Sequence, residues 1–279
     1  MRALILLLFL HFSVFSIGQS LNLASDSWPP FTDKAGNTAV AMELVEEALG
    51  REKISVTYEV ADFKVVLEGL QEGSFDGSAA LWYSDERSTY LSYSQPYLEN
   101  QLVLVGLKGS DVSQQSLSEL KDKRVAIVAT YDYGEALDTV SGVEWVTSSS
   151  DQESLELLFK AEADYMLADA LLAEHLIQDQ EAEVAEFLEI GEHTLLRRSL
   201  YFAVQRSNPQ ADEILDKFNK RIREMMADGS YNEILQLNWI QMDVDGDGRI
   251  EWVSQSKEAG EEAPEDAYSL DSDLSANSD

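Results

Sequence analysis

LWYSDERSTYLSYSQPY, residues 81–97, sets one arginine, Arg87, among aromatic rings and hydroxyl groups just before Pro96. The apolar run QLVLVGL, residues 101–107, comes next and is typical of a buried strand, and the polar run SDVSQQS follows it. A guanidinium is a rigid, two-pronged donor that matches a carboxylate. The stretch therefore leaves two interpretations of Arg87, either a solvated surface charge or a group that holds an anion.

Upstream of this stretch, strand-like and helix-like patterns alternate. We expect strands at residues 21–25, 54–60 and 76–80, with helices over Thr38–Leu49 and from the cap Asp62 to Gly73. A double proline soon after the first strand forbids further ladder pairing, so a loop lies at that strand's carboxyl end. The alternation predicts a mainly parallel sheet flanked by helices.

Downstream, the same alternation repeats in a second unit. The expected elements are strands at 124–129, 143–146, 164–167 and 195–204, and helices over 133–137, 150–161, 169–178, 208–229 and 231–237. We predict an α/β fold of two lobes, the second inserted into the first, with a ligand cleft between them. The first lobe is assigned to residues 19–105 and 200–240 and the second to 106–199, with hinges near Val103–Leu107 and Leu196–Phe202.

The composition limits the classes of partner. Among 279 residues, 52 are Asp or Glu and 20 are Lys or Arg, which gives a formal net charge of −32. Such a surface repels nucleic acid and anionic membranes, and there is no basic patch, so nucleic acid is excluded as a partner. The chain has no cysteine, which excludes disulfides and thiolate chemistry.

The two ends of the chain differ from its middle. Residues 1–18 combine Arg2, a short apolar run and small residues up to Gly18, which is the plan of a cleaved secretory signal peptide. The run is shorter than the roughly 20 residues that a membrane span needs, so we expect an exported, periplasmic protein. Residues 255–279 consist largely of Ser, Ala and acidic residues, which predicts a disordered tail.

In this order and spacing, the segments resemble the periplasmic solute-binding proteins of the polar amino acid type, which feed ABC importers. The resemblance covers roughly residues 20–240. The motifs that carry it are Trp28-Pro29-Pro30-Phe31, Gly73-Ser74-Phe75-Asp76-Gly77, Ser84-Asp85-Glu86-Arg87 with Ser94-Gln95-Pro96-Tyr97, Lys123-Arg124-Val125-Ala126-Ile127, and Met225 with Ala227-Asp228-Gly229-Ser230-Tyr231. It implies the two-lobed periplasmic binding protein fold of type II.

The resemblance also implies roles for single residues. Arg87 matches the arginine that pairs with a ligand's α-carboxylate, Trp28 the aromatic residue that packs on the ligand's side chain, and Asp169 the carboxylate that receives the α-ammonium. Asp169 also suits a helix N-cap, which is the alternative for that residue. Phe63 is open between the pocket and the core, and core packing is favoured.

The sequence departs from the family pattern at two places in the expected pocket. Trp82 stands where a small residue is usual, and Tyr131-Asp132 stand where a Thr or Ser is usual. We expect all three side chains to line the pocket. Our hypothesis is that Asp132 and Asp169 together favour a ligand with more positive than negative charge.

Residues 243–251 read DVDGDGRIE and match the first nine positions of an EF-hand calcium loop. The metal-binding positions hold Asp243, Asp245, Asp247, Arg249, whose position supplies a backbone carbonyl, and Glu251. Ser254 stands at the twelfth position in place of a bidentate glutamate, and no long helix follows. We predict a weak structural Ca²⁺ site, with a solvated acidic turn as the alternative, and no required cofactor.

The leading functional interpretation is a monomeric binding protein that captures a small polar ligand, an amino acid or an amine-bearing relative, for the membrane permease of an ABC importer. We do not expect an enzyme, because the chain has three His, no Cys, and nothing that resembles a nucleophile–base pair. Two alternatives stay open. The same module could be a ligand sensor, or a dehydratase or lyase that uses Asp132, Asp169 or Glu135 as acid and base.

Overall fold

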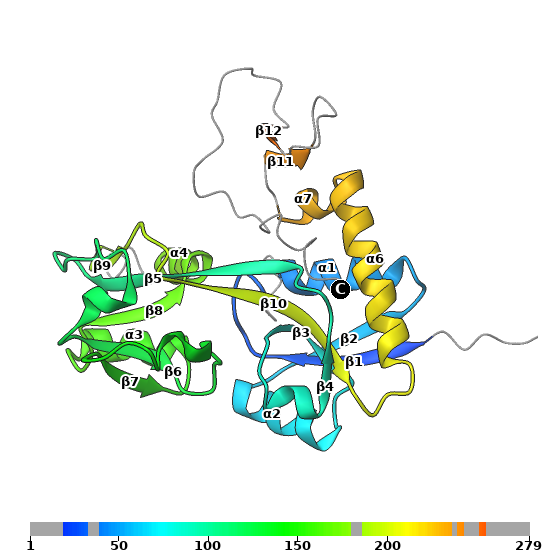
Figure 1. Ribbon diagram of the computed structural model, residues 1–279, viewed down its shortest axis with the longest axis horizontal. Coiled ribbons are helices and arrows are strands. Elements are labelled where there is room, and N and C mark those ends of the chain that lie inside the picture. The colour runs from blue at the N-terminus through cyan, green and yellow to red at the C-terminus, as the bar shows by residue number, and fades with distance from the viewer. Residues whose placement is uncertain (1–18, 33–38, 180–185, 236–238, 243–250, 255–279) are drawn as a thin grey trace, which may run out of the picture.

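Two lobes joined by a pair of long strands make up the described part of the chain (Figure 1). The structure is a computed structural model that describes residues 19–32, 39–179, 186–235, 239–242 and 251–254. The expected signal peptide and acidic tail lie outside these residues, and so does the predicted calcium loop except for Glu251.

The first lobe is a β-α-β-α-β unit. Its elements are β1 (Ser20–Ser25), α1 (Val40–Gly50), β2 (Ser55–Val60), α2 (Phe63–Glu72), β3 (Gly77–Trp82), the 3₁₀ turn η1 (Arg87–Thr89) and β4 (Leu91–Tyr93). β1 lies between β2 and β3 and pairs in parallel with both, because α1 and α2 carry the chain back between successive strands. This confirms the predicted order of elements.

The second lobe repeats the plan. Its elements are η2 (Leu117–Leu120), β6 (Arg124–Val128), η3 (Gly134–Ala136), β7 (Glu144–Ser148), α3 (Asp151–Phe159), β8 (Tyr165–Asp169), α4 (Ala170–Asp179) and β9 (Leu188–Ile190). β6 lies between β7 and β8 and is parallel to both. A helix was expected over residues 133–137, but the structure has only the 3₁₀ turn η3 there. The connection from β6 to β7 therefore contains no crossover α-helix.

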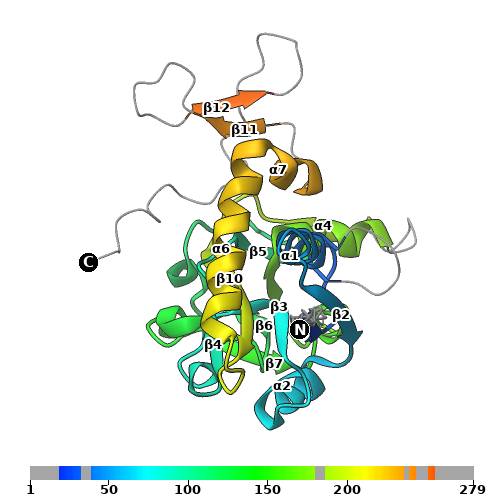
Figure 2. The same cartoon turned by 90° about the vertical axis from the view of Figure 1, so that its right-hand side faces the viewer.

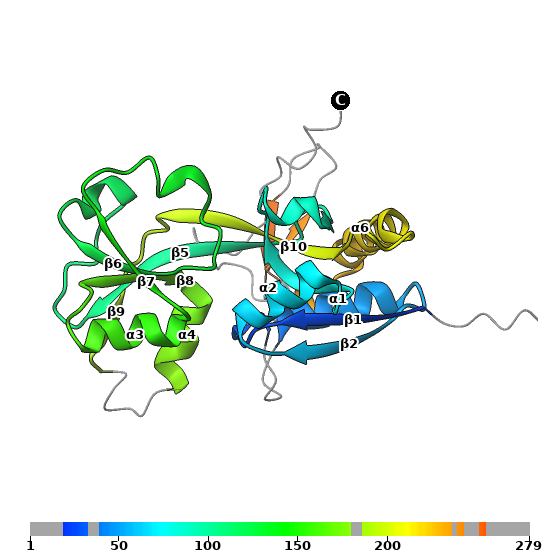
Figure 3. The same cartoon turned by 90° about the horizontal axis from the view of Figure 1, so that it is seen from below.

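The lobes are joined by β5 (Leu98–Leu107) and β10 (Leu196–Gln205), which run side by side between them (Figure 3). The two strands pair antiparallel over Leu98–Leu102 and Leu196–Leu200. The crossing from the first lobe therefore lies a few residues before the expected hinge at Val103–Leu107 and the expected boundary at residue 105. Residues 102–107 already pair with β8 and β9 of the second lobe, and the whole forms one continuous mixed sheet.

The chain returns to the first lobe through α6 (Ala211–Asp228) and α7 (Ser230–Leu235). α6 lies alongside α1 (Figure 2), and its Phe218 ring packs 4.9 Å from Phe202 and 5.4 Å from Tyr97 between ring centroids. Gly229 ends the helix with a left-handed φ of 88°, as the sequence predicts. None of the helices in the described ranges is long and apolar enough to cross a membrane.

A two-stranded antiparallel hairpin follows, formed by β11 (Trp239–Met242) and β12 (Glu251–Ser254). Met242 pairs with Glu251, so the backbone on either side of the predicted calcium loop belongs to a hairpin. The calcium site itself stays a prediction.

Candidate functional site

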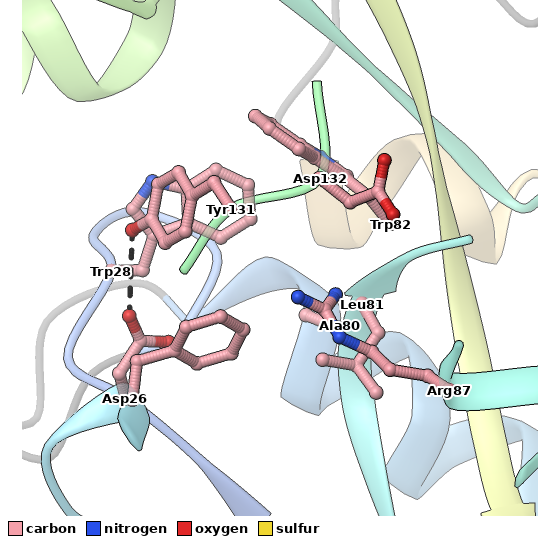
Figure 4. Close-up of a pocket in the computed structure, with 9 residues that line it drawn as sticks. Asp26, Trp28, Ala80, Leu81, Trp82, Arg87, Tyr131 and Asp132 are labelled. Atoms are coloured by element: carbon pink, nitrogen blue, oxygen red, sulfur yellow. Dashed lines mark hydrogen bonds between the residues drawn. The ribbon is translucent and has the colours of Figure 1, made fainter. Parts of the chain in front are cut away.

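A cavity between the lobes has about 280 Å³ of empty space, part of it open to solvent (Figure 4). Its walls are Asp26, Trp28, Phe63, Ala80, Leu81, Trp82, Arg87, Tyr131 and Asp132. Strands β1, β3 and β6 each end next to these residues, and the carboxyl ends of parallel strands are where α/β sheets bind ligands. The cavity thus lies where the two lobes face each other.

Arg87 is not a solvated surface charge, because only 8% of the residue is exposed. Its position follows from a tight turn after β3, in which Ser88 N–H donates to the Ser84 carbonyl at 2.9 Å and Tyr90 N–H to the Arg87 carbonyl at 3.1 Å. Its Nη2 donates to the Thr130 carbonyl of the second lobe at 2.6 Å. Within the described residues, its Nε and Nη1 have no protein acceptor. Two donors of a buried cation thus remain for an anion.

Four aromatic rings form much of the cavity wall. Tyr131, from the second lobe, lies 6.0 Å from Trp28, 5.4 Å from Phe63 and 5.4 Å from Trp82 between ring centroids. Trp28 and Trp82 are 5.8 Å apart and nearly perpendicular. The pairs are edge-to-face except for Trp28–Tyr131, which is tilted. Edge-to-face packing is favourable for rings, so Tyr131 joins the second lobe to three rings of the first. Phe63, for which core packing was favoured, lies in the cavity wall.

Trp28 and Asp26 are held by a loop that folds back on itself. Trp28 N–H donates to the Thr32 carbonyl at 2.6 Å, and Thr32 Oγ1 donates to the Asp26 carbonyl at 2.8 Å. Pro29 and Pro30 occupy the turn between them, where no strand ladder needs their missing N–H groups. The loop therefore presents one ring and one carboxylate to the cavity.

Two carboxyl groups from different lobes approach the hydroxyl of Tyr131. The hydroxyl donates to Asp151 Oδ2 at 2.8 Å and lies 3.5 Å from Asp26 Oδ2. Burial raises the pKa of Asp26 to about 6, against its hydrogen bonds to its own backbone and to Tyr131. Burial, opposed by the Tyr131 hydrogen bond and assisted by repulsion from Asp26 and Asp169, raises the pKa of Asp151 to about 7. The pair is thus costly to hold fully ionised.

Asp169, expected to receive an α-ammonium, does not line the cavity. Its Oδ1 accepts from the N–H groups of Leu171 and Leu172 and so caps α4, which was the alternative for this residue. Its Oδ2 accepts from Asn100 Nδ2 and Gln101 N–H, each at 3.1 Å.

A chain of hydrogen bonds connects the cavity wall to this buried carboxylate. Trp82 Nε1 donates to Asn100 Oδ1 at 2.8 Å, and Asn100 in turn donates to Asp169. Trp82 and Asn100 therefore separate the cavity from Asp169. Asn100 donates the hydrogen bond to Asp169 Oδ2 that a ligand's ammonium would otherwise donate.

Asp132 lies in the cavity wall, as expected, but its charge is compensated. Its Oδ1 accepts from Gly134 N–H at 3.0 Å and lies 3.6 Å from Arg198 Nη2. Arg198 also extends over the ring of Trp82, at 5.7 Å from the centroid. The hypothesis that Asp132 and Asp169 favour a cationic ligand therefore loses its support, since the protein already engages both carboxylates.

The comparisons with known proteins agree with this architecture. The family model of the bacterial extracellular solute-binding proteins, family 3, matches residues 21–242. The chain belongs to this family. The resemblance seen in the sequence and the two-lobed type II fold are thereby confirmed.

Several relatives of this family 3 protein are known. The L-cystine-binding protein TcyJ of Escherichia coli (strain K12) is 23% identical over 78% of this chain and 81% of its own length. TcyA of Bacillus subtilis (strain 168), also an L-cystine-binding protein, is 24% identical over 78% of this chain and 80% of its own. The solved structure of an ancestral arginine-binding protein bound to arginine is 25% identical, with a TM-score of 0.65 over 78% of this chain and 96% of that one. These relatives are binding proteins by name.

Reading the sequence of this family 3 protein missed three groups at the site. Asp26 immediately precedes the Ser27-Trp28-Pro29-Pro30 loop, and that position at the end of a strand was an available signal. Asp151 has the ordinary appearance of a first-turn helix residue behind the cap Ser150, and Arg198 that of a strand residue, so neither had a local signal. Among the described residues, no group of three or more His, Asp and Glu is placed to hold a metal ion.

Proposed function

We propose that this protein captures a small solute that bears a carboxylate, an amino acid or an amine-bearing relative, and delivers it to the membrane permease of an ABC importer. One observation carries the proposal. Arg87 is buried in the wall of an interlobe cavity, and two of its guanidinium nitrogens have no protein acceptor in the described part of the chain. The relatives named for binding L-cystine and arginine support an amino acid, and so a small carboxylate-bearing solute, as the ligand.

Capture requires the lobes to close on the ligand, and two contacts join the lobes at the cavity. They are the Arg87–Thr130 hydrogen bond and the packing of Tyr131 on the rings of the first lobe. β5 and β10 are the connections that would bend. A closed form with the ligand inside is the form that a permease would recognise. The family's extracellular setting supports export, and the cleaved signal peptide and periplasmic location remain part of this proposal.

The test is thermal unfolding of the purified protein with a panel of amino acids, polyamines, betaines and small carboxylates. A ligand at about 100 times its Kd adds about 2.7 kcal/mol to the free energy of unfolding and raises Tm by several degrees. Arg87→Ala should lower the affinity at least about 100-fold, because two charge-assisted hydrogen bonds are lost.

Arg223→Ala is the matched control, since Arg223 is an exposed arginine of α6 that donates to Gln95. It should bind as the natural protein does. A ligand whose Tm shift survives in Arg87→Ala would show that Arg87 is not the carboxylate site. A panel without any shift would remove the proposed ligand class.

A further inference from the structure

We infer that the ligand is a zwitterion whose carboxylate binds Arg87 and whose positive charge is an N-alkylated ammonium held by Asp26 and the surrounding rings. This inference rests on the proposed function and narrows its ligand class. It differs from recognition of an ordinary amino acid, in which a primary α-ammonium would bind Asp169.

The cavity wall carries a negative charge, on Asp26, and a positive charge, on Arg87. Figure 4 shows Asp26 and Arg87 on opposite sides of the drawn residues, with the guanidinium pointing toward the middle of the pocket. Asp26 has no cationic side chain within 4.0 Å and Arg87 no carboxylate, as far as the described residues show. Two enclosed charges of opposite sign thus share one cavity without pairing, and a ligand that carries both charges would compensate both.

The described cavity wall offers few free hydrogen-bond acceptors to a ligand's ammonium group. A primary ammonium has three N–H donors and loses affinity when they stay unpaired. Of the polar groups in the wall, Asp132 is engaged by Gly134 and Arg198, and the Tyr131 hydroxyl donates to Asp151. Within the described residues, Asp26 is the one carboxylate of the wall without a cationic partner. A quaternary ammonium, with three methyl groups on its nitrogen, fits such a wall because it has no N–H donors to satisfy.

Aromatic rings provide much of the surface of the cavity wall. Trp28, Phe63, Trp82 and Tyr131 line the same cavity. Arg87 already lies over Phe63, at 5.6 Å from the ring centroid, and Arg198 over Trp82, at 5.7 Å, so Trp28 and Tyr131 are the rings that a ligand's cation would contact. The faces of such rings attract cations within about 6 Å of the centroid. Quaternary ammonium groups are recognised in this way because their charge is spread over methyl groups that pack as apolar surface. The wall therefore offers both the apolar contact and the electrostatic attraction that an alkylated cation needs.

Among the described residues, no uncompensated carboxylate lies beside the α-position of a ligand whose carboxylate binds Arg87. In an amino acid the ammonium sits on the carbon next to the carboxylate, so binding of the carboxylate to Arg87 confines it to that side of the cavity. Ala80 and Leu81 lie beside Arg87 there (Figure 4), and the centroid of the Phe63 ring lies 5.6 Å from its guanidinium carbon. The carboxylate of Asp132, in the same wall, is compensated by Arg198. Asp169 already accepts four hydrogen bonds from protein N–H groups and lies beyond Trp82 and Asn100.

The ligand's cation is also coupled to closure of the two lobes. Asp26 of the first lobe and Asp151 of the second meet at the Tyr131 hydroxyl when the lobes are together, and the pKa of each is raised. A positive charge beside Asp26 lowers the cost of keeping both carboxylates ionised in the closed form. The ligand's cation would thus favour the closed form, which an uncharged or anionic ligand would not.

The experiment is isothermal titration of the full chain with matched ligand pairs. γ-Butyrobetaine is compared with γ-aminobutyrate, and δ-valerobetaine with 5-aminovalerate, because in all four the cation lies several carbons away from the carboxylate. The methylated member of at least one pair should bind at least about tenfold more tightly than its parent. The isostere 5,5-dimethylhexanoate should bind at least about tenfold more weakly than γ-butyrobetaine, because it keeps the shape and the carboxylate but lacks the cation.

Variants of the wall locate the cation site. Asp26→Asn and Trp28→Leu should each weaken binding of the methylated ligand at least about fivefold. Trp28→Phe, which keeps a smaller ring, serves as a second variant if Trp28→Leu does not fold, and it should lose less affinity. Phe159→Leu is the matched control, because Phe159 is 43% exposed on α3 and lies outside the cavity wall, and it should leave the affinity unchanged.

The outcomes separate this inference from the proposed function. If a parent amino acid binds as tightly as its methylated partner, or tighter, the inference is wrong and the proposed function stands. If 5,5-dimethylhexanoate binds as well as γ-butyrobetaine, the site does not sense the cation and the inference is also wrong. If no carboxylate-bearing ligand binds the folded protein, the proposed function fails and the inference fails with it.

Discussion

Replacing Tyr131 by phenylalanine removes one hydroxyl from the meeting point of the two lobes. That hydroxyl donates to Asp151 at 2.8 Å, and this hydrogen bond lowers a pKa that burial has raised from 3.8 to about 7. A hydrogen bond to a charged group contributes about 1.5–3 kcal/mol, and one to a neutral group about 0.5–1.5 kcal/mol. Tyr131→Phe should therefore cost roughly 2 kcal/mol where Asp151 is ionised and about 1 kcal/mol where it is protonated.

The direction in which the cost of Tyr131→Phe changes with pH follows from the linkage between proton binding and folding. A carboxyl whose pKa is higher in the folded protein than in the unfolded chain stabilises the fold fully below the unfolded pKa, and this contribution is lost as pH rises through the folded pKa. For Asp151 the loss falls between about pH 4 and pH 7. Without its donor the folded pKa of Asp151 rises further, so the variant loses more stability over the same range and just above it.

Urea denaturation of both proteins at about pH 5.5 and about pH 8.5 measures the effect, with Tyr131→Phe expected to cost about 1 kcal/mol more at the higher pH. Tyr165→Phe is the matched control, since the hydroxyl of Tyr165 in the same lobe donates to the uncharged carbonyl of Asp111 at 2.7 Å. Its cost should not change with pH. Equal costs for Tyr131→Phe at the two pH values would refute the coupling between the phenol and an ionising Asp151.

Three further substitutions test the scaffold of the site, each by thermal or urea denaturation. Asn100→Ala should destabilise the protein by roughly 3 kcal/mol, because the buried N–H of Trp82 and the carboxylate of Asp169 each lose a partner; a change below about 1 kcal/mol would contradict this. Gly77→Ala should cost roughly 3 kcal/mol, since the added Cβ would lie 2.1 Å from the backbone oxygen of Ala203 on β10. Gly50→Ala, where a Cβ meets nothing within 4 Å at the end of α1, should stabilise by about 0.5 kcal/mol, and destabilisation there would show that space does not decide the difference.

The order of the elements could be predicted because their signals are local. The apolar face of α6 and its end at Gly229 depend only on side-chain spacing and on a left-handed backbone position. The residue at which the chain crosses from one lobe to the other was harder to predict from the sequence. The run over residues 101–107 is apolar throughout, and nothing in it distinguishes pairing with β10 from pairing with β8, which the tertiary fold decides.

The same distinction explains the site. Arg87, Trp28, Trp82, Tyr131 and Asp132 were expected in the pocket and do line one cavity, because each lies in or next to a recognisable motif. The meeting of Asp26 with Tyr131 joins residues 105 positions apart in the chain, and no local pattern reports such a contact. The compensation of Asp132 by Arg198 is equally non-local, so its charge could be identified from the sequence but not its neutralisation.

The acidity of the chain adds a reason for recognising a cation with rings. A formal net charge of −32 attracts cations of every kind to the surface, so negative charge alone cannot select one ligand among them. Small inorganic cations and primary ammonium ions are strongly hydrated, and their transfer into an apolar, ring-lined cavity costs more than a single carboxylate returns. An alkylated ammonium is weakly hydrated and gains ring contact on entry. In a cavity where Asp26 is the only uncompensated carboxylate of the described wall, the rings therefore decide which cation enters, and the surface charge decides only how often one arrives.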